Sequence, residues 1–464
     1  MTTASPRIVI VGAGPAGVRA AEALVACGVR PVLVDEGERA GGQIYRRPPA
    51  AFRRGAGELY GADAAKAQAL HAVFDRIVDR IDYRPRTLAW HLWERALHVV
   101  CGDISVALPF DALIVCSGAT DRLLPVPGWQ RAGCYSLGGA QIALKAQGCA
   151  VGARTLFLGT GPLLDLVATQ YLKAGAGVVA VLDTAPPLAA LGALPGLLAR
   201  PLLLARGLQM RRTLQGAGVP RLSGVVPLSI DGDDEQGVRA VVVRDARGRE
   251  RRFEADAVAM GWHLRAESQL ADLAGCAFEF DRASRQWLPR VDADGRSSVP
   301  GVYLAGDGAR LLGADGAENT GRLAALSALA DLGHAAGLNA HRAQVEGLRT
   351  RLQRLQRFRR ALAMAGPWPQ ALAAALPDDT VVCRCEGVTA GTLRHTVRDM
   401  GSDELNRSKA FSRAGMGRCQ GRYCAHAAAE VVAAAVGVPV QQVGRLRGQP
   451  PVKPLPMSVG EGPT

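Results

Sequence analysis

The sequence predicts an α/β protein made of two βαβ units, one inserted into the other, followed by a small α-rich module that carries cysteines. Three observations support this fold class. Glycine-rich turns at residues 12–17 and 159–164 each lie between a short apolar run and a helical pattern. A further apolar run at 301–305 returns after the second unit, and the last cysteines gather after residue 380.

The first unit begins with the β-rich run Arg7–Val11, and a helix is expected over Pro15–Cys27 with a second strand at Pro31–Asp35. Between strand and helix stands a G-x-G-x-x-G turn. Its first glycine allows the tight turn, its second lets backbone approach a pyrophosphate, and its third lets helix and strand pack closely. The residues that we expect to cradle a pyrophosphate are Gly12, Gly14, Pro15, Ala16 and Gly17.

The end of the second strand carries two acids, Asp35 and Glu36. A carboxylate at this position accepts hydrogen bonds from the hydroxyls of an adenosine ribose. The sequence leaves open which of the two does so. Strand, glycine turn, helix and terminal acid together predict a dinucleotide site.

The second unit has a degenerate glycine turn. Gly159 and Gly161 are kept, but Leu164 replaces the third glycine, which we expect to push helix and strand apart. Asp183 still ends the following strand, so ribose binding stays possible. The alternatives are a nicotinamide site, a site for another adenine nucleotide, or a scaffold that binds nothing.

Four of the ten cysteines form a pattern, Cys383-x-Cys385 and Cys419-x4-Cys424. Four thiolates suit an iron–sulfur cluster or Zn²⁺, and the tight C-x-C pair favours a [2Fe-2S] cluster over zinc or unligated thiols. Nearby glycines leave backbone N–H groups free for the cluster sulfurs, and nearby arginines offset its negative charge. Those residues are Gly415, Gly417, Gly421, Arg384, Arg418 and Arg422.

Composition limits the function classes. The net charge of +13 suggests an acidic partner or acidic cofactors, but no recognition motif supports nucleic acid. The start of the chain does not resemble a secretory leader, and the apolar stretch 187–205 is interrupted by prolines and an arginine, so we expect no membrane span and a cytoplasmic protein. The segment 349–360 predicts a solvated basic helix face, and 188–212 is either partner-facing or a plain surface helix pair.

Further short motifs resemble the flavoproteins that contain two dinucleotide-binding domains. These are Gly41-Gly42-Gln43, the turn Cys116-Ser117-Gly118 and the late Gly306-Asp307. The resemblance implies FAD in the first unit, with Gly42, Gln43, Gly118, Gly306 and Asp307 along the flavin. The redox cysteine pair of the disulfide reductases in that group is missing here.

The cysteine segment resembles the [2Fe-2S] domain of bacterioferritin-associated ferredoxin, although that small protein usually has two residues in its second pair. The stretch AGMGRCQGRYC, together with Gly41-Gly-Gln-Ile-Tyr-Arg46, is similar to the flavoprotein subunits of heteromeric amine and imino-acid dehydrogenases. These include opine oxidase A subunits, the B subunit of hydrogen cyanide synthase, and proline and hydroxyproline dehydrogenase α subunits. The resemblance covers about residues 5–440.

Three functions follow as hypotheses. The first is an FAD and [2Fe-2S] electron-transfer subunit that works with an FAD-dependent, substrate-oxidising β-type subunit plus a small ferredoxin-like subunit, on an opine, imino acid or related amine. The second is a stand-alone NAD(P)H-dependent reductase, which needs a working second nucleotide site. The third is an interaction module with a structural cluster. The sequence shows no catalytic constellation besides the cofactor sites.

The predicted domain boundaries follow from these motifs. Residues 1–125 and 286–365 form the two parts of the FAD domain, the second part including the basic helix. Residues 126–285 form the inserted dinucleotide-type domain, 366–445 the cluster domain, and 446–464 an unstructured tail rich in Pro and Gly.

Overall fold

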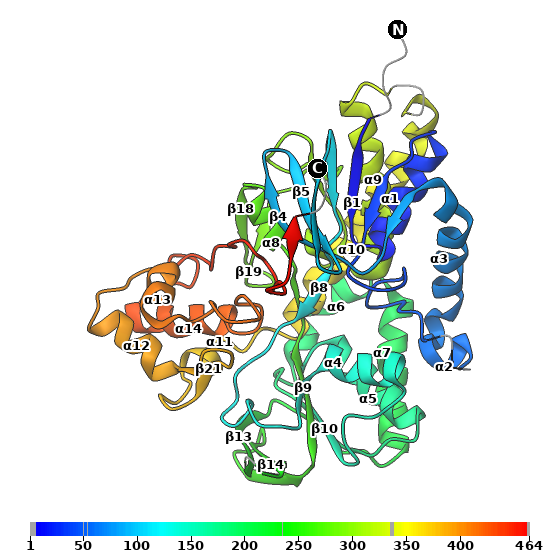
Figure 1. Cartoon of the computed structure of the whole chain (residues 1–464). Helices are drawn as coiled ribbons and strands as arrows, with labels where there is room; N and C mark the ends of the chain where they lie inside the picture. Colours follow the sequence, from blue (N-terminus) through cyan, green and yellow to red (C-terminus); the bar gives the residue numbers. More distant parts are fainter. Residues whose placement is uncertain (1–5, 50, 53, 234, 335–337, 462–464) are drawn as a thin grey trace.

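The computed structural model describes residues 6–49, 51–52, 54–233, 235–334 and 338–461. Figure 1 shows three lobes, with the N-terminal unit at the top, the second unit below it, and the C-terminal domain on the left. Residues 1–5, where no leader is predicted, and residues 462–464 of the predicted tail lie outside the described residues.

The N-terminal unit is a parallel five-stranded sheet with the order β20-β7-β1-β2-β3. Its strands are β1 (Ile8–Val11), β2 (Val32–Val34), β3 (Asp82–Arg84), β7 (Ala112–Val115) and β20 (Val302–Leu304). The helices around it are α1 (Pro15–Ala26), α2 (Ala56–Tyr60), α3 (Ala64–Ile77) and α9 (Gly313–Asp331). Every residue of β1 is buried, as expected for a central parallel strand covered on both faces.

A second parallel sheet, ordered β12-β11-β10-β16-β9, forms the inserted unit. Its strands are β9 (Cys134–Ser136), β10 (Thr155–Thr160), β11 (Val178–Asp183), β12 (Arg221–Ser223) and β16 (Ala257–Trp262), and an antiparallel sheet of β13 (Val226–Asp233), β14 (Gly237–Arg244) and β15 (Glu250–Glu254) lies beside them. Its helices are α4 (Leu137–Ile142), α5 (Pro162–Lys173), α6 (Ala189–Leu197) and α7 (Pro201–Gly216).

The two units are joined by a two-stranded ribbon in which β8 (Ala119–Asp121) pairs with β17 (Leu264–Ala266). The chain therefore returns to the first unit near residue 264, not near the predicted boundary at 285. The following α8 (Gln269–Leu273), β18 (Phe278–Asp281) and β19 (Gln286–Pro289) precede the return of β20. Buried residues of α8 share a core with β1 and β7, which explains the shift of the boundary.

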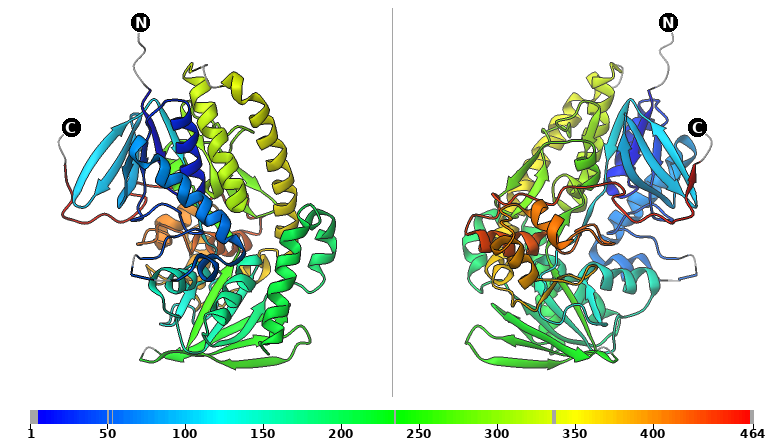
Figure 2. Two further views of the ribbon diagram at one scale, coloured as in Figure 1. Left: turned by 90° about the vertical axis from the view of Figure 1, so that its right-hand side faces the viewer. Right: turned by 60° about the vertical axis from the view of Figure 1, so that its left-hand side comes forward.

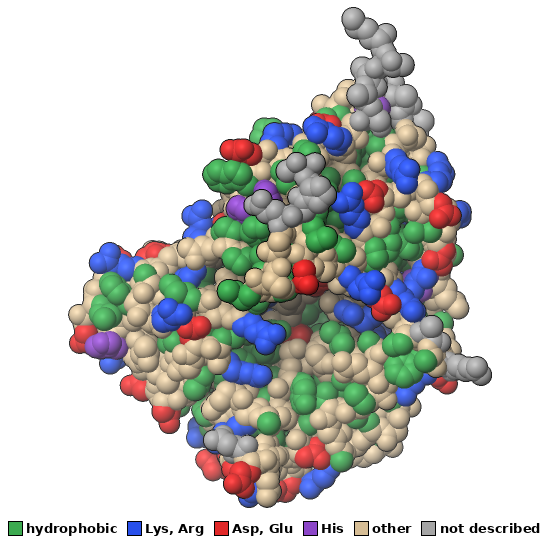
Figure 3. Space-filling model, in the orientation of Figure 1, with side chains coloured by type: hydrophobic (Ala, Val, Ile, Leu, Met, Phe, Trp, Pro, Cys, Tyr) green, Lys and Arg blue, Asp and Glu red, His purple; other side chains and the backbone are tan. Residues whose placement is uncertain are grey.

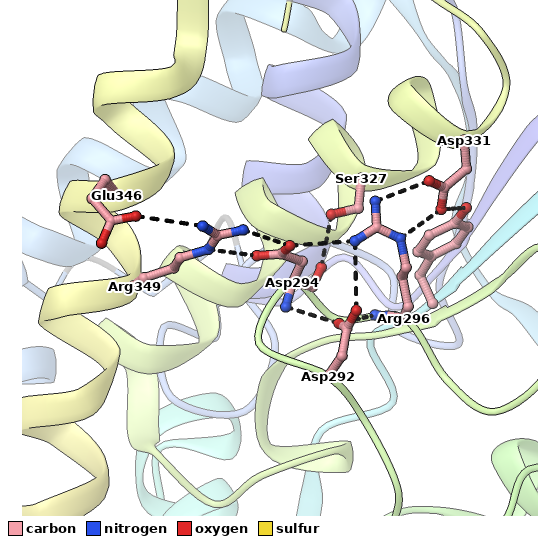
Figure 4. A network of polar contacts seen from close by, with 8 residues as sticks. Asp292, Asp294, Arg296, Ser327, Asp331, Glu346 and Arg349 are labelled. Carbon is pink, nitrogen blue, oxygen red and sulfur yellow. Dashed lines mark hydrogen bonds and ion pairs between the residues drawn. The ribbon is translucent and has the colours of Figure 1, made fainter.

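The predicted basic helix face belongs to α10 (Leu338–Ala365), the longest helix in the described part of the chain. One side of this helix is buried, through Leu348, Leu352, Leu355 and Phe358. Arg349 binds both carboxylate oxygens of Asp294 (2.8 and 2.7 Å) within a network that includes Arg296 and Asp331 (Figure 4). The helix is thus solvated on one face and fixed to the N-terminal unit on the other.

The C-terminal domain has a hydrophobic core of its own. It contains α11 (Gln370–Ala374), β21 (Val381–Cys383), β22 (Val388–Thr389), α12 (Ala390–Arg398), α13 (Leu405–Ser412) and α14 (Ala425–Val436). Figure 2 shows this domain, in orange, at the level where the two dinucleotide units meet. It is therefore placed to contact both of them.

The tail differs from the prediction over residues 446–461. Its last strand, β23 (Gly460–Glu461), adds to the antiparallel sheet of β4 (Thr87–Trp93), β5 (Ala96–Cys101) and β6 (Ile104–Pro109). Val452 is 2% exposed and donates its N–H to the carbonyl of Trp90 (3.1 Å). Pro and Gly richness predicts a lack of helix and strand, but long-range packing orders this segment.

Positive charge is spread over the molecule. On the face in Figure 3, Lys and Arg side chains stand among acidic ones, and several lie in the centre of the view where the three lobes meet. None of the helices in the described part of the chain combines the length and the apolar character needed to cross a membrane.

Candidate functional site

The first glycine turn brings strand, loop and helix into backbone contact. Gly12 has φ +98°, and a Cβ there would lie 2.4 Å from the carbonyl oxygen of Cys116. A Cβ on Gly17 would lie 1.8 Å from the carbonyl oxygen of Gly12. Larger residues are therefore sterically excluded at both positions, as the fingerprint predicts.

Gly14 has a different role, because its backbone does not require glycine. It caps the N-terminus of α1 with extended dihedral angles, and the nearest atom to an added Cβ is Cα of Gly42, at 3.6 Å. Gly41 donates its N–H to the carbonyl of Ala13 (2.8 Å), so the Gly41-Gly42 segment is held beside this turn. Pro15 and Ala16 open the helix, and its free N–H groups face the space that the glycines leave.

The two acids after β2 have different environments. Asp35 is largely buried and accepts hydrogen bonds from the N–H groups of Ala13 (2.5 Å) and Gly37 (2.6 Å). Burial raises the pKa of Asp35, and these hydrogen bonds oppose the rise. Glu36 is half-exposed and forms an ion pair with Lys453 of the tail. Asp35 therefore fixes the turn, whereas the carboxylate of Glu36 faces solvent.

The late motif lies at the same edge of the sheet. A Cβ on Gly306 would lie 3.0 Å from Cβ of Ala16, and one on Gly308 would lie 3.3 Å from the backbone nitrogen of Gly118. Asp307 accepts hydrogen bonds from the N–H groups of Leu312 and Gly313, both at 2.8 Å. Burial raises the pKa of Asp307. Sequence motifs that are far apart thus meet at one edge.

Gln43 is predicted to line the flavin, together with Gly42, Gly118, Gly306 and Asp307. Its side chain is exposed and accepts a hydrogen bond from Arg46 (2.9 Å). Gly118 has φ +73° and an open space around its Cα, so it leaves room beside the turn. A cradle of glycines with helix N–H groups facing it fits an FAD pyrophosphate.

The second glycine turn is covered by the protein itself. The ring of His263 would lie 2.8 Å from a Cβ on Gly161, and its Nε2 is 2.6 Å from the carbonyl oxygen of Gly366. A Cβ on Gly366 would lie 2.9 Å from Oγ1 of Thr160 and 3.6 Å from the nitrogen of Gly161. The end of α10 therefore occupies the space above the turn.

The acid of the second unit is also engaged. Asp183 forms an ion pair with Arg221 (2.9 Å) and accepts a hydrogen bond from the N–H of Ala185 (2.9 Å). Arg221 binds Asp165 as well (2.9 Å), and all these groups are largely buried. Leu164 is fully buried in the core of the unit with Leu137 and Phe157. Ribose hydroxyls would have to compete with an internal ion pair.

The four cysteines of the C-terminal domain lie together. Cys383 ends β21, Cys424 precedes α14, and the other two lie in the intervening turns. The Cys424 thiol hydrogen-bonds to Cys383 and Cys419, and Cys385 contacts Cys419. The N–H of Gly415 donates to the sulfur of Cys383 (3.5 Å), and that of Gly421 donates to Cys419.

This environment favours thiolates at two positions. The hydrogen bond from Cys424 is the largest cause that lowers the pKa of Cys383 to about 6, and it also lowers the pKa of Cys419. In the described residues, no three His, Cys, Asp or Glu side chains converge as ligands of a single metal ion. A two-iron cluster needs two thiolates on each iron, and two adjacent pairs suit this requirement.

A buried ion-pair network connects the cluster loop with the first unit. Arg422 binds Glu267 through two hydrogen bonds (2.8 and 3.0 Å), and Arg265 donates to the carbonyl of Arg422 (3.4 Å). Glu267 donates its N–H to the carbonyl of Gly118 and accepts a hydrogen bond from the hydroxyl of Ser117. One residue therefore contacts both the flavin-side turn and the cluster loop.

The charges near the cluster differ in part from the prediction. Arg384 and Arg418 are exposed, whereas Arg422 is buried against Glu267. Arg265 lies near Cys419 and Cys424 and is 8% exposed. Sequence reasoning missed Arg265 and Glu267. The only signal was a pair of opposite charges two residues apart, directly after a buried strand.

Comparisons with known proteins agree with both cofactor domains. The family model for pyridine nucleotide-disulphide oxidoreductases matches residues 6–329, and the model for BFD-like [2Fe-2S] binding domains matches residues 381–434. The opine oxidase A subunit of Rhizobium meliloti is 36% identical over 97% of this chain and 86% of that protein. Hydrogen cyanide synthase subunit HcnB of Pseudomonas aeruginosa is 32% identical over 97% of each.

Solved structures agree on the fold. L-proline dehydrogenase from P. horikoshii has a TM-score of 0.69 at 17% identity, covering 98% of this chain and 79% of that one. Thioredoxin reductase from T. acidophilum has a TM-score of 0.52 at 19% identity, covering 70% of this chain and 98% of that one. The predicted fold class and cofactor types, FAD and a [2Fe-2S] cluster, are confirmed. The chain belongs to the pyridine nucleotide-disulphide oxidoreductase family, as a flavin-dependent oxidoreductase with a BFD-like [2Fe-2S] domain.

Proposed function

We propose that this chain is the electron-transfer subunit of a heteromeric dehydrogenase that oxidises an opine, a proline-type imino acid or a related amine. Support comes from its relatives, which are named as subunits of opine oxidase and of hydrogen cyanide synthase. FAD accepts two electrons together and passes them singly to a one-electron cluster, so the two cofactors suit a relay. The C–N bond would be oxidised in a partner subunit.

The observation that carries this proposal is the contact between the two cofactor regions. Glu267 binds the turn at Ser117-Gly118 through its backbone and Arg422 through its side chain. Arg422 in turn donates to the carbonyl of the cluster ligand Cys419 (3.2 Å). A rigid, buried connection of this kind keeps the two groups at a fixed separation.

The residues proposed to hold the cofactors follow from the geometry. In this proposal the turn at Gly12–Gly17, the acids Asp35 and Glu36, Gly42, Gly118 and Asp307 surround FAD. The chain's part is to bind the pyrophosphate with helix N–H groups and to exclude water around it. The four cysteines would ligate the cluster as thiolates, and Arg265 would offset part of their charge.

The second candidate, a stand-alone NAD(P)H-dependent reductase, is disfavoured by the second glycine turn. Gly366 and His263 cover the turn, and Arg221 holds Asp183. A nicotinamide dinucleotide or another adenine nucleotide would have to displace both. We therefore propose that electrons enter from a partner flavoprotein, and that a small ferredoxin-like subunit completes the complex.

The compartment is also proposed. All ten cysteines are free of disulfides, as is usual in the reducing cytoplasm. We accordingly propose a cytoplasmic location for the complex.

The test is gentle anaerobic purification of the tagged chain from its own host, with mass spectrometry of the bound proteins. Co-purification of a second flavoprotein and a small iron–sulfur protein supports the relay, and candidate amines are then screened on the complex. A chain that elutes alone and whose flavin is bleached by NADH or NADPH contradicts the proposal.

A further inference from the structure

Helix α6 and the two residues that cap it carry an exposed row of leucines. The row contains Leu188 (72% exposed), Leu191 (65%), Leu194 (43%) and Leu198 (55%). Their spacing of three to four residues puts them on one helix face. Leu202, in the first turn of the following helix α7, is also exposed, at 77%. We call these five residues the leucine row.

The opposite face of α6 is apolar as well, and it is already used. Ala193 and Leu197 are buried against Phe358 and Ala361 of α10. A helix that is apolar on all sides is normally buried on all sides. A contiguous apolar surface of this kind marks an interaction site more often than single exposed leucines do.

The edge of this surface is basic. Arg351, Arg354, Arg357 and Arg360 of α10 are exposed, and within the described chain no carboxylate lies within 4.0 Å of their guanidinium groups. A Cβ on Gly196 of α6 would lie 3.4 Å from the carbonyl oxygen of Arg357, so α6 packs against α10 at this arginine. Figure 2 (left) shows α6 and α7, in green, at one edge of the molecule, with α10 descending to them.

Three other arginines of this region already have partners. Arg200, Arg206 and Arg211 pair with Asp315, Asp63 and Asp165, respectively. The arginines on α10 therefore supply the charge that has no counterpart within the described chain. A partner that covers the leucine row would contact these positively charged arginines at the edge of the interface.

A second copy of this chain is a poor occupant. In a two-fold dimer the same patch meets itself, so the interface would gather the arginines of both copies without adding a carboxylate to neutralise them, in a chain whose net charge is already +13. A different protein with an apolar centre and an Asp/Glu-rich rim would bury the leucines and neutralise the arginines.

We propose that the leucine row and the exposed arginines of α10 form the docking surface for an acidic partner subunit, the substrate-oxidising flavoprotein. This inference rests on the proposed function and adds the location of the interface and the charge of the partner. It also implies that α10 contacts the partner on one face and closes the second glycine turn with its end.

The test compares three variants of the tagged full chain, purified anaerobically from its host. The first double variant, Leu191→Ser/Leu194→Ser, makes the leucine row polar. The second, Arg354→Glu/Arg357→Glu, reverses the charge of two of the arginines on α10. The matched control, Leu208→Ser, removes an exposed leucine of α7 outside the row. Flavin and cluster absorbance per chain shows that each variant is folded and loaded.

The expected result is a loss of at least about tenfold in co-purified flavoprotein for both double variants, while the control retains it. Mass spectrometry identifies that protein, and its binding to the wild type should weaken as salt rises. Retention of the partner by both double variants overturns the docking proposal and leaves the relay proposal intact.

Three other outcomes also overturn the docking surface. If the wild type itself brings no flavoprotein, the relay proposal and the docking surface fail together. If the leucine variant only converts a wild-type dimer into monomers, the row is a self-interface. If the only effect of the leucine variant is that the protein no longer floats together with vesicles of anionic phospholipid, the row binds membranes.

Discussion

The two glycine turns of this chain share one sequence pattern and differ in what covers them. At Gly12–Gly17 a Cβ added to Gly14 would meet only Cα of Gly42, at 3.6 Å, so no side chain lies against this part of the turn. At Gly159–Leu164 the equivalent space is filled by His263 and Gly366. A glycine motif therefore describes the local backbone, and the rest of the chain decides whether a ligand can reach it.

The acids after the two turns differ in the same way. Asp35 binds only backbone N–H groups, and its neighbour Glu36 reaches solvent. Asp183 is held by a buried arginine that also binds Asp165. The acid of the first unit leaves its neighbour Glu36 free to reach solvent, whereas the acid of the second unit is held in an internal ion pair with Arg221.

Filling the open turn should have the largest effect. Gly14→Val places a side chain where only Cα of Gly42 is near, in a backbone conformation that any residue adopts. We expect flavin content after gel filtration to fall by at least about tenfold, with unchanged circular dichroism. An isosteric change in the closed turn, Thr160→Val, should keep full flavin content. Equal flavin in both variants would place the FAD elsewhere.

Acid should loosen the closed turn. Burial lowers the pKa of His263 to about 4, against about 6.5 in the unfolded chain. The unfolded state then binds the proton first, so stability is complete above pH 6.5 and falls by about 3 kcal/mol as the pH drops to 4. Urea unfolding of the wild type and of His263→Gln checks this. If the unfolding free energies of the two proteins depend on pH in the same way, the imidazole of His263 is accessible to protons in the folded state.

Removing the charge of Asp183 should affect stability and not flavin. Asp183→Asn keeps the acceptor for Ala185 but weakens the buried pair with Arg221, at a cost of about 1–3 kcal/mol in unfolding free energy. Denaturant titration and flavin absorbance measure the two effects. Asp35→Asn is the counterpart in the open turn, and it should lower flavin affinity instead. Loss of NADH binding in Asp183→Asn would show that the second site works.

The smallest expected effect concerns the link between the cofactor regions. Glu267→Gln leaves two buried arginines beside Cys419 without their counter-charge, which favours the more negative, reduced cluster. We expect the reduced-to-oxidised ratio at a fixed potential to rise about tenfold, or about 59 mV for one electron. Potentiometric titration followed by electron paramagnetic resonance measures it. The exposed Glu254→Gln is the control, and an unchanged potential in both would contradict the link.

The fold class was predictable because its signals are local. The β1 strand, the glycine turn and α1 follow one another within residues 8–26. Close backbone contacts at Gly12 and Gly17 exclude residues larger than glycine at these two positions. The cysteine pattern was informative for a similar reason, since the spacing of thiol ligands reflects the metal group that they hold. Neither inference required knowledge of distant residues.

Long-range packing decided the rest. Gly366 is more than 200 residues from the turn at Gly159 that it covers, and Arg265 and Glu267 gain their role only when the cluster domain docks. The tail became ordered because β6 offered a free edge to Gly460, and the boundary near 264 is set by the pairing of β8 with β17. The sequence by itself determined which groups this protein can bind, because those signals are steric and chemical. The tertiary structure decided which glycine turn is covered by the protein itself, because burial and ion pairing depend on residues that no local pattern connects.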